Sequence, residues 1–258
     1  DDKGFVRYGY YPHNVHFIVT SAQMGGDLPT AMREGRKLAG IVDAETATQI
    51  AWIQAIHAAP YFAALQFAPA AEVLEMPAPD PRLAYVQGVR HYARAVAYAQ
   101  QKNENGFDRE MKELARIRGS DALKPMVDQG VPAPDLLGIA EHVARGRHAS
   151  LRGRHLQAAD HFRKAVAIED SIPYMEPPFW YYPVQQSLGA ALYRAGRYSE
   201  AQQAFTAALA KYPGNGWALY GLAASEQKLG RRAQAAAATA ALNRAWMGDP
   251  KWLRMERL

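Results

Sequence analysis

The sequence contains no cysteine, which excludes disulfide bonds, thiolate metal ligands and a cysteine nucleophile. It also lacks a run of about 18 apolar residues, the length that a helix needs to cross a bilayer. The most apolar stretch, residues 58–73, is interrupted by Pro60 and Pro69. A strong excess of one charge is missing too. The net charge of +5 is spread along the chain and does not indicate binding to nucleic acid.

The short motifs of common catalytic sites are absent from the sequence. It has no Gly-rich phosphate loop, no Gly-x-Ser-x-Gly turn and no His-Glu-x-x-His pair. Carboxylates such as Glu110 and Glu169 fall on helix faces that we expect to be exposed, where ion pairs explain them. No segment alternates between apolar and polar residues over the length of a strand. The sequence therefore favours an all-α protein and gives little support for an enzyme.

What the sequence does contain is a repeat with a period of 34 residues between Pro183 and Leu242. Leucine, small residues and a Gly-Arg pair recur at this spacing: Leu188, Gly189, Gly196, Arg197, Ala201 and Ala208 return as Leu222, Ala223, Gly230, Arg231, Ala235 and Leu242. Small residues let two helices cross closely, and glycine permits the backbone turn where the first helix ends. Each unit is thus predicted to be a helix, a short turn and a second helix.

One unit of this repeat resembles the tetratricopeptide (TPR) consensus. The matching residues are Leu188, Gly189, Leu192, Ala201, Phe205, Ala208 and Pro213. We therefore expect an all-α, right-handed α-solenoid of TPR and TPR-like helix hairpins. It is expected to form one superhelical domain over residues 1–258, with the clearest repeats at about 139–172, 182–215 and 216–249. Residues 44–57 and 60–67 are expected to form a further helix pair.

Three phrases extend the resemblance to a bacterial group of TPR proteins. They are Tyr-Pro-His-Asn-Val-His-Phe at residues 11–17, Glu-Pro-Pro-Phe-Trp-Tyr-Tyr-Pro-Val at 176–184 and Asn-Gly-Trp-Ala-Leu-Tyr-Gly-Leu at 215–222. The resemblance implies that the chain is the C-terminal part of a protein with further repeats before it. It implies the fold but no particular biochemical activity. Nothing in the sequence chooses between the cytoplasm and the periplasm.

His13 and His16 are three residues apart, so they are expected to share one helix face that lines the concave groove. Imidazoles at this spacing can bind a transition metal such as Zn, Cu or Ni, or hold an anionic ligand. The alternative is a structural role, in which His13 or Asn14 caps the helix and the imidazoles pack against tyrosines.

An aromatic loop, residues 174–182, interrupts the repeats and contains Glu176, Trp180 and Tyr181. A stiff loop of this kind either forms one wall of a pocket or fills the groove as a plug. Glu176 is expected to pair with an arginine or histidine of the groove.

The repeat frame predicts which side chains face the concave groove. They are Gln186, Tyr193, Trp217 and Tyr220, together with Arg194 and Gln227, and they are expected to form an accessible aromatic trough. The alternative is that Trp217 and Tyr220 pack on adjoining helices. Arg147 belongs to a cluster with Arg145, Arg152 and Arg154 that either holds an anion or forms a solvated face.

Two functions follow from these patterns. The first is a scaffold that binds a protein or peptide in its concave groove, without a cofactor. The second is a small-ligand or metal-binding protein, catalytic or not, organised by His13, His16 and the aromatic loop; it requires this loop to fold back over the first hairpin. Trp246, Trp252 and Leu258 predict either a C-terminal capping helix or an interface with a second copy.

Overall fold

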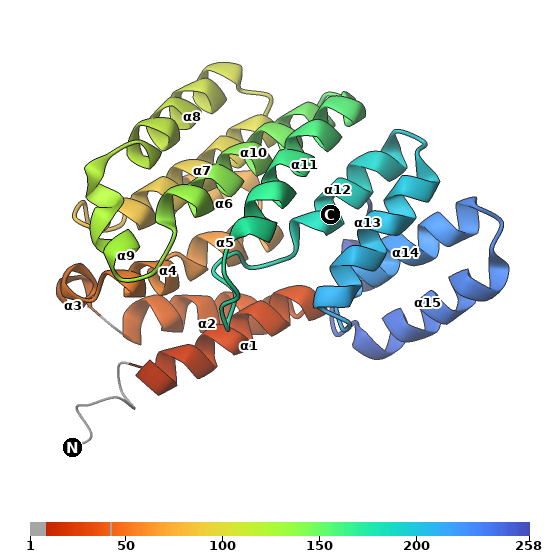
Figure 1. Cartoon of the computed structure of the whole chain (residues 1–258), viewed down its shortest axis with the longest axis horizontal. Helices are drawn as coiled ribbons and strands as arrows, with labels where there is room; N and C mark the ends of the chain where they lie inside the picture. Colours follow the sequence, from red (N-terminus) through yellow and green to blue (C-terminus); the bar gives the residue numbers. More distant parts are fainter. Residues whose placement is uncertain (1–8, 42) are drawn as a thin grey trace.

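The computed structural model describes residues 9–41 and 43–258, and over these residues the chain is helical without a β-strand (Figure 1). In chain order the α-helices are α1 (Tyr11–Gly25), α2 (Leu28–Ile41), α3 (Ala44–Gln49), α4 (Gln54–His57), α5 (Ala59–Phe67), α6 (Ala70–Glu75), α7 (Ala84–Gln100), α8 (Glu104–Arg118), α9 (Lys124–Asp128), α10 (Ala133–Leu151), α11 (His155–Ser171), α12 (Val184–Arg194), α13 (Tyr198–Lys211), α14 (Gly216–Lys228) and α15 (Arg232–Ala245). Short 3-10 turns are η2 (Ala51–Ile53), η3 (Asp121–Leu123) and η4 (Pro250–Trp252). Among the described residues, no helix is both long and apolar enough to span a membrane.

Neighbouring helices pack as hairpins, and the hairpins stack side by side. The pairs are α1 with α2, α7 with α8, α10 with α11, α12 with α13 and α14 with α15, and α11 and α13 also contact the following α12 and α14. The protein is therefore a TPR-like helical solenoid. The last three pairs fall at the three clearest repeats of the sequence, although α10 begins six residues earlier than 139.

The Gly-Arg pairs end the first helix of each of these three hairpins. Gly153, Gly196 and Gly230 have φ angles of 75°, 78° and 74°, a left-handed conformation that favours glycine. In each turn the amide of the next residue, an arginine, donates to a carbonyl five residues earlier, as Arg197 does to Leu192 at 2.9 Å. The repeated dipeptide thus produces the same sharp turn three times.

Small residues set the distance between the hairpins. The ring of Phe205 lies between Gly189 of α12 and Gly221 of α14, and a methyl group on either glycine would overlap the ring. Gly146 of α10 meets Phe162 in the same way. An aromatic ring packed against glycine therefore occurs in both α10–α11 and α12–α13 and keeps adjacent helices in close contact.

The predicted helix over residues 44–57 is wrong, because this segment is broken into α3, η2 and α4. The break lies at Ile50, whose φ and ψ are −108° and 80°. The side chain of Gln129 bridges it: its Oε1 accepts from the amide of Trp52 at 3.3 Å and its Nε2 donates to the carbonyl of Gln49 at 3.4 Å. Gln129 thus satisfies backbone groups that a continuous helix would have paired internally.

The first hairpin (α1–α2) meets the last hairpin (α14–α15), so the solenoid closes on itself. Nε1 of Trp217 donates to the carbonyl of Gln23 at 2.8 Å, and the amide of Met247 donates to the carbonyl of Gly25 at 2.8 Å. The ring of Trp246 packs directly against Gly26 and Gly216, and it leaves no room for a side chain at either position. In Figure 1, α1 runs beneath the stack toward α14, consistent with these contacts.

The expected capping helix is also wrong. After α15 the chain continues as a tail, residues 246–258, that contains only the short turn η4. The tail returns to the inner face of the solenoid, where Met255 and Leu258 are buried and the carbonyl of Leu258 accepts from Oγ of Ser187 at 3.0 Å. Figure 1 accordingly places the C-terminus in the middle of the molecule. An interface with a second copy remains a prediction.

Candidate functional site

His13 and His16 lie on α1 but face different surroundings. His16 is only 3% exposed, and its ring centroid lies 4.8 Å from that of Tyr181. His13 is half-buried and meets Phe17 edge-on, while Asn14 is exposed. Burial, followed by the charge of His13, lowers the pKa of His16 to about 3, so His16 is neutral at pH 7. The two imidazoles therefore do not share one open surface.

The aromatic loop does fold back over the first hairpin, as the second hypothesis requires. Tyr181 reaches the ring of His16, and its hydroxyl donates to the carbonyl of Ala55 at 3.3 Å. Within the described residues, however, no group of three or more His, Cys, Asp or Glu side chains is placed to hold a metal ion. Metal binding by His13 and His16 stays a prediction.

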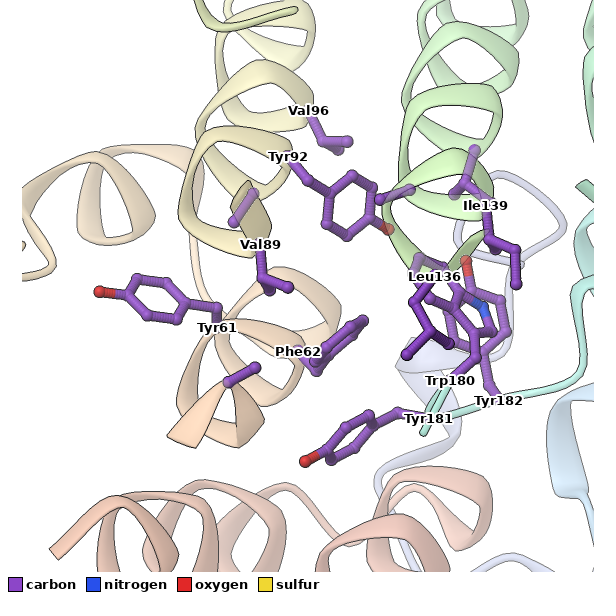
Figure 2. Close-up of a cluster of buried hydrophobic side chains, with 14 of the residues drawn as sticks. Tyr61, Phe62, Val89, Tyr92, Val96, Leu136, Ile139, Trp180, Tyr181 and Tyr182 are labelled. Atoms are coloured by element: carbon purple, nitrogen blue, oxygen red, sulfur yellow. The ribbon is translucent and has the colours of Figure 1, made fainter. Parts of the chain in front are cut away.

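The end of the aromatic loop fills the interior as a plug. Phe179, Trp180, Tyr181 and Tyr182 are all buried. The Tyr181 ring stacks on Phe62 of α5 with centroids 4.4 Å apart, and the Trp180 ring meets Phe62 edge-on at 5.1 Å. Figure 2 shows Trp180, Tyr181 and Tyr182 gathered between α5, α7 and α10, with Tyr92 of α7 beside them.

The expected pairing of Glu176 with a groove arginine or histidine is wrong. Glu176 is exposed, and its carboxylate accepts a hydrogen bond from the hydroxyl of Tyr174, a side chain that is 81% exposed. The first part of the loop thus lies on the surface. There it borders a mostly apolar pocket of about 710 Å³ that also contains Phe17 and Glu169.

Glu169 is an ionisable group of this pocket, although the sequence had placed it on an exposed helix face. Its carboxylate accepts from the amide of Val184 at 3.1 Å and so satisfies a free N–H group at the start of α12. Burial raises the pKa of Glu169 to about 7, against the partly opposing charge of Lys211. Glu169 is half-buried, and Glu110 is buried rather than exposed, but Glu110 does form the expected ion pairs, with His91 at 2.7 Å and Arg94 at 3.1 Å.

A rise in pH should destabilise the protein through Glu169. Its folded-state pKa, about 7, exceeds the ordinary 4.5, so the folded protein holds the proton more tightly than the unfolded chain. The stability that Glu169 contributes is therefore fully present below pH 4.5 and is lost as pH rises through 7. Glu169→Gln keeps an acceptor for the Val184 amide but cannot ionise. Relative to the unaltered protein, it should gain about 2–3 kcal/mol of stability between pH 5 and pH 8. Urea unfolding of both proteins at pH 5 and pH 8 measures this gain. If the difference in unfolding free energy between the variant and the unaltered protein were the same at both pH values, the prediction would be contradicted.

Three predicted groove residues lie inside the closed solenoid. Trp217 and Gln186 are 1% and 2% exposed, so the accessible trough is wrong at these positions. Asn215 organises them: its Oδ1 accepts from the amide of Trp217 at 3.0 Å, and its Nδ2 donates to Gln186 at 2.8 Å. Arg147 lines a small internal cavity together with Gln186. Their positions face the concave side, but that side is covered by the first hairpin, the aromatic loop and the tail.

Toward the last hairpin the inner face stays open, in a groove of about 1040 Å³ that we term the open groove. It contains Tyr193 and Tyr220, which are half-buried, and the exposed Gln227. Its remaining walls are small or apolar residues of α14, α15 and the tail, namely Ala223, Ala224, Gly230, Ala235, Ala236, Thr239, Leu242, Pro250 and Leu253. Arg232 is the one lysine or arginine that lines this groove within the described part of the chain.

Burial raises the pKa of both tyrosines in the open groove, so their hydroxyls remain protonated donors at pH 7. The surface offers two aromatic rings, an amide and a guanidinium over a floor of methyl groups. Such a surface can bind apolar side chains and orient a polar or acidic group beside them.

The segment that forms the open groove is also the segment with a family match. Residues 192–256 match the family model of the tetratricopeptide repeat. They extend from the end of α12 through α13, α14 and α15 into the tail. No curated protein matches the chain. The match agrees with the TPR-like solenoid of the structure, and a repeat of this kind suggests a scaffold for protein interactions.

Proposed function

We propose that this protein is an interaction scaffold that binds a peptide segment of another protein in the open groove. The observation that carries the proposal is the position of Tyr193 and Tyr220, which line this groove within the segment that matches the TPR family. The rest of the inner face is covered by the chain itself. A partner therefore has access to the two tyrosines but not to Trp217.

The lining of the open groove indicates the chemistry of the peptide. Alanines provide a shallow floor that suits small aliphatic side chains. Arg232 is exposed at the edge and forms no ion pair with any described residue. An exposed guanidinium without an ion pair favours a carboxylate on the partner. The expected ligand is a peptide with aliphatic residues next to an aspartate or glutamate.

Selection from a random peptide library, followed by affinity titration of the selected peptides, tests this proposal. Tyr220→Ala and Arg232→Glu should each weaken binding at least about tenfold, equivalent to ~1.4 kcal/mol. The matched controls are Tyr174→Ala and Arg244→Glu, exposed residues outside the groove, which should bind within about twofold of the unaltered protein. Equal affinity of the groove variants and their controls would exclude the open groove as the binding surface.

A further inference from the structure

Two arginines meet at a small cavity in the interior of the solenoid. Arg147 reaches it from α10 and Arg257 from the tail, and the cavity has a volume of about 20 Å³. The rest of the lining consists of Gln23, Phe62, Leu65, Gln66, Tyr92, Tyr182 and Gln186. The cavity therefore lies where distant parts of the chain converge.

No carboxylate of the described residues balances the charges of these two arginines; the guanidinium of Arg257 instead stacks on Trp252, 4.0 Å from the ring centroid. Two other arginines of the cluster around Arg147 are paired: Arg145 lies 3.0 Å from Glu141, and Arg152 pairs with Glu104. Arg147 and Arg257 make no ion pair with any residue that the structure describes. Burial and the charges of Arg254 and Arg147 lower the pKa of Arg257, which reflects the repulsion between the groups.

Several hydrogen-bond donors are also left without partners at this place. Nε of Arg147, Nη1 of Arg257 and the hydroxyl of Tyr182 are buried atoms without a well-formed hydrogen bond, and the hydroxyls of Tyr182 and Tyr92 are the neutral polar groups that face the Arg147 guanidinium. Buried donors without partners are destabilising, and buried guanidinium groups without a counter-charge more so. Glu256, a carboxylate of the tail next to Arg257 in the sequence, is exposed and lines a neighbouring cavity instead.

We propose that this cavity binds a small anion, held by the guanidinium groups of Arg147 and Arg257 and by the hydroxyl of Tyr182. A volume of about 20 Å³ accommodates a species little larger than a water molecule. The size fits a chloride ion or a single carboxylate group, and charge-assisted hydrogen bonds from arginine suit both. Because Pro250 and Leu253 of the same tail line the open groove, the anion also holds that wall in position.

Thermal unfolding of the full chain at constant ionic strength tests the site. Chloride, acetate or phosphate is titrated at pH 7 in exchange for the bulky organic sulfonate MES, which is too large for the cavity. We expect Tm to rise to a plateau with chloride, with acetate or with both. A response to chloride alone identifies an inorganic ion, and a response to acetate identifies a carboxylate group.

Two variants separate the site from a general effect of salt. Arg257→Gln and Arg147→Gln should abolish the plateau, whereas Arg244→Gln, an exposed arginine of α15, should retain it. Arg257 belongs to the tail, so Arg257→Gln decides the result even if Arg147→Gln does not fold. Equal Tm responses to all anions, or the same plateau in Arg257→Gln as in the unaltered protein, would overturn the proposal.

Discussion

Trp217→Ala should lower the free energy of unfolding by about 3–5 kcal/mol, the range for removing a large buried aromatic side chain. Trp217 is 1% exposed and packs at a right angle on Trp246, with ring centroids 4.8 Å apart. Its Nε1 donates to the carbonyl of Gln23, a residue of the first hairpin. The substitution thus removes a core ring and one of the hydrogen bonds that join the two ends of the solenoid.

Urea unfolding followed by circular dichroism measures this effect. Trp217→Phe keeps much of the ring but loses the donor, so it should show an intermediate loss of about 1–2 kcal/mol. Tyr174→Ala removes an exposed ring and should change stability by less than about 0.5 kcal/mol. If Trp217→Ala and Tyr174→Ala unfolded at the same urea concentration, the contacts of Trp217 between the first and last hairpins would contribute nothing to the free energy of unfolding. Trp217 would then again be a candidate for the binding surface.

The repeats were predictable because their determinants are local. Gly196 and Gly230 end helices through bonds within six residues, and Gly189 and Phe205 belong to one hairpin. A period of 34 residues therefore contains nearly all the information that forms each turn and each helix crossing. The break at Ile50 escaped prediction because the residue that stabilises it, Gln129, lies far along the chain.

The inner face was predictable in part. The repeat frame selected Gln186 and Trp217 as concave positions, and they do point to the inside, where Asn215 connects them. What covers them depends on contacts such as that between Trp217 and Gln23, which are 194 residues apart. No periodicity encodes such a contact. Of the predicted concave positions, Tyr193, Tyr220 and Gln227 lie in the groove that remains open near the last hairpin.

The different surroundings of His13 and His16 did leave a signal in the sequence. Pro12, Val15, His16 and Val19 follow the i, i+3, i+4, i+7 pattern of a buried helix stripe, and all four are buried. His13 falls outside this stripe. The pattern therefore indicates that His16 packs in the core, whereas the spacing of the two histidines alone suggested a shared site.

The burial of His16 predicts a steep loss of stability in acid. Its folded-state pKa of about 3 lies below the ordinary 6.5, so the unfolded chain binds the proton first as pH falls. This contribution is fully present above pH 6.5 and is lost progressively as pH falls toward 3. At pH 4.5 the loss attributable to His16 should be about 2–3 kcal/mol, from ~1.4 kcal/mol per pH unit.

His16→Phe isolates this contribution, because phenylalanine keeps an aromatic ring beside Tyr181 and cannot be protonated. Unfolding free energies at pH 7.5, 6.0 and 4.5 should fall less steeply for this variant than for the unaltered protein. His161→Phe is the matched control: His161 is half-buried, and burial lowers its pKa too, so its replacement should flatten the curve less. Parallel curves for His16→Phe and the unaltered protein would show that His16 accepts a proton in the folded state. The aromatic loop over α1 would then have to open readily, since protonation of an enclosed imidazole requires access to water.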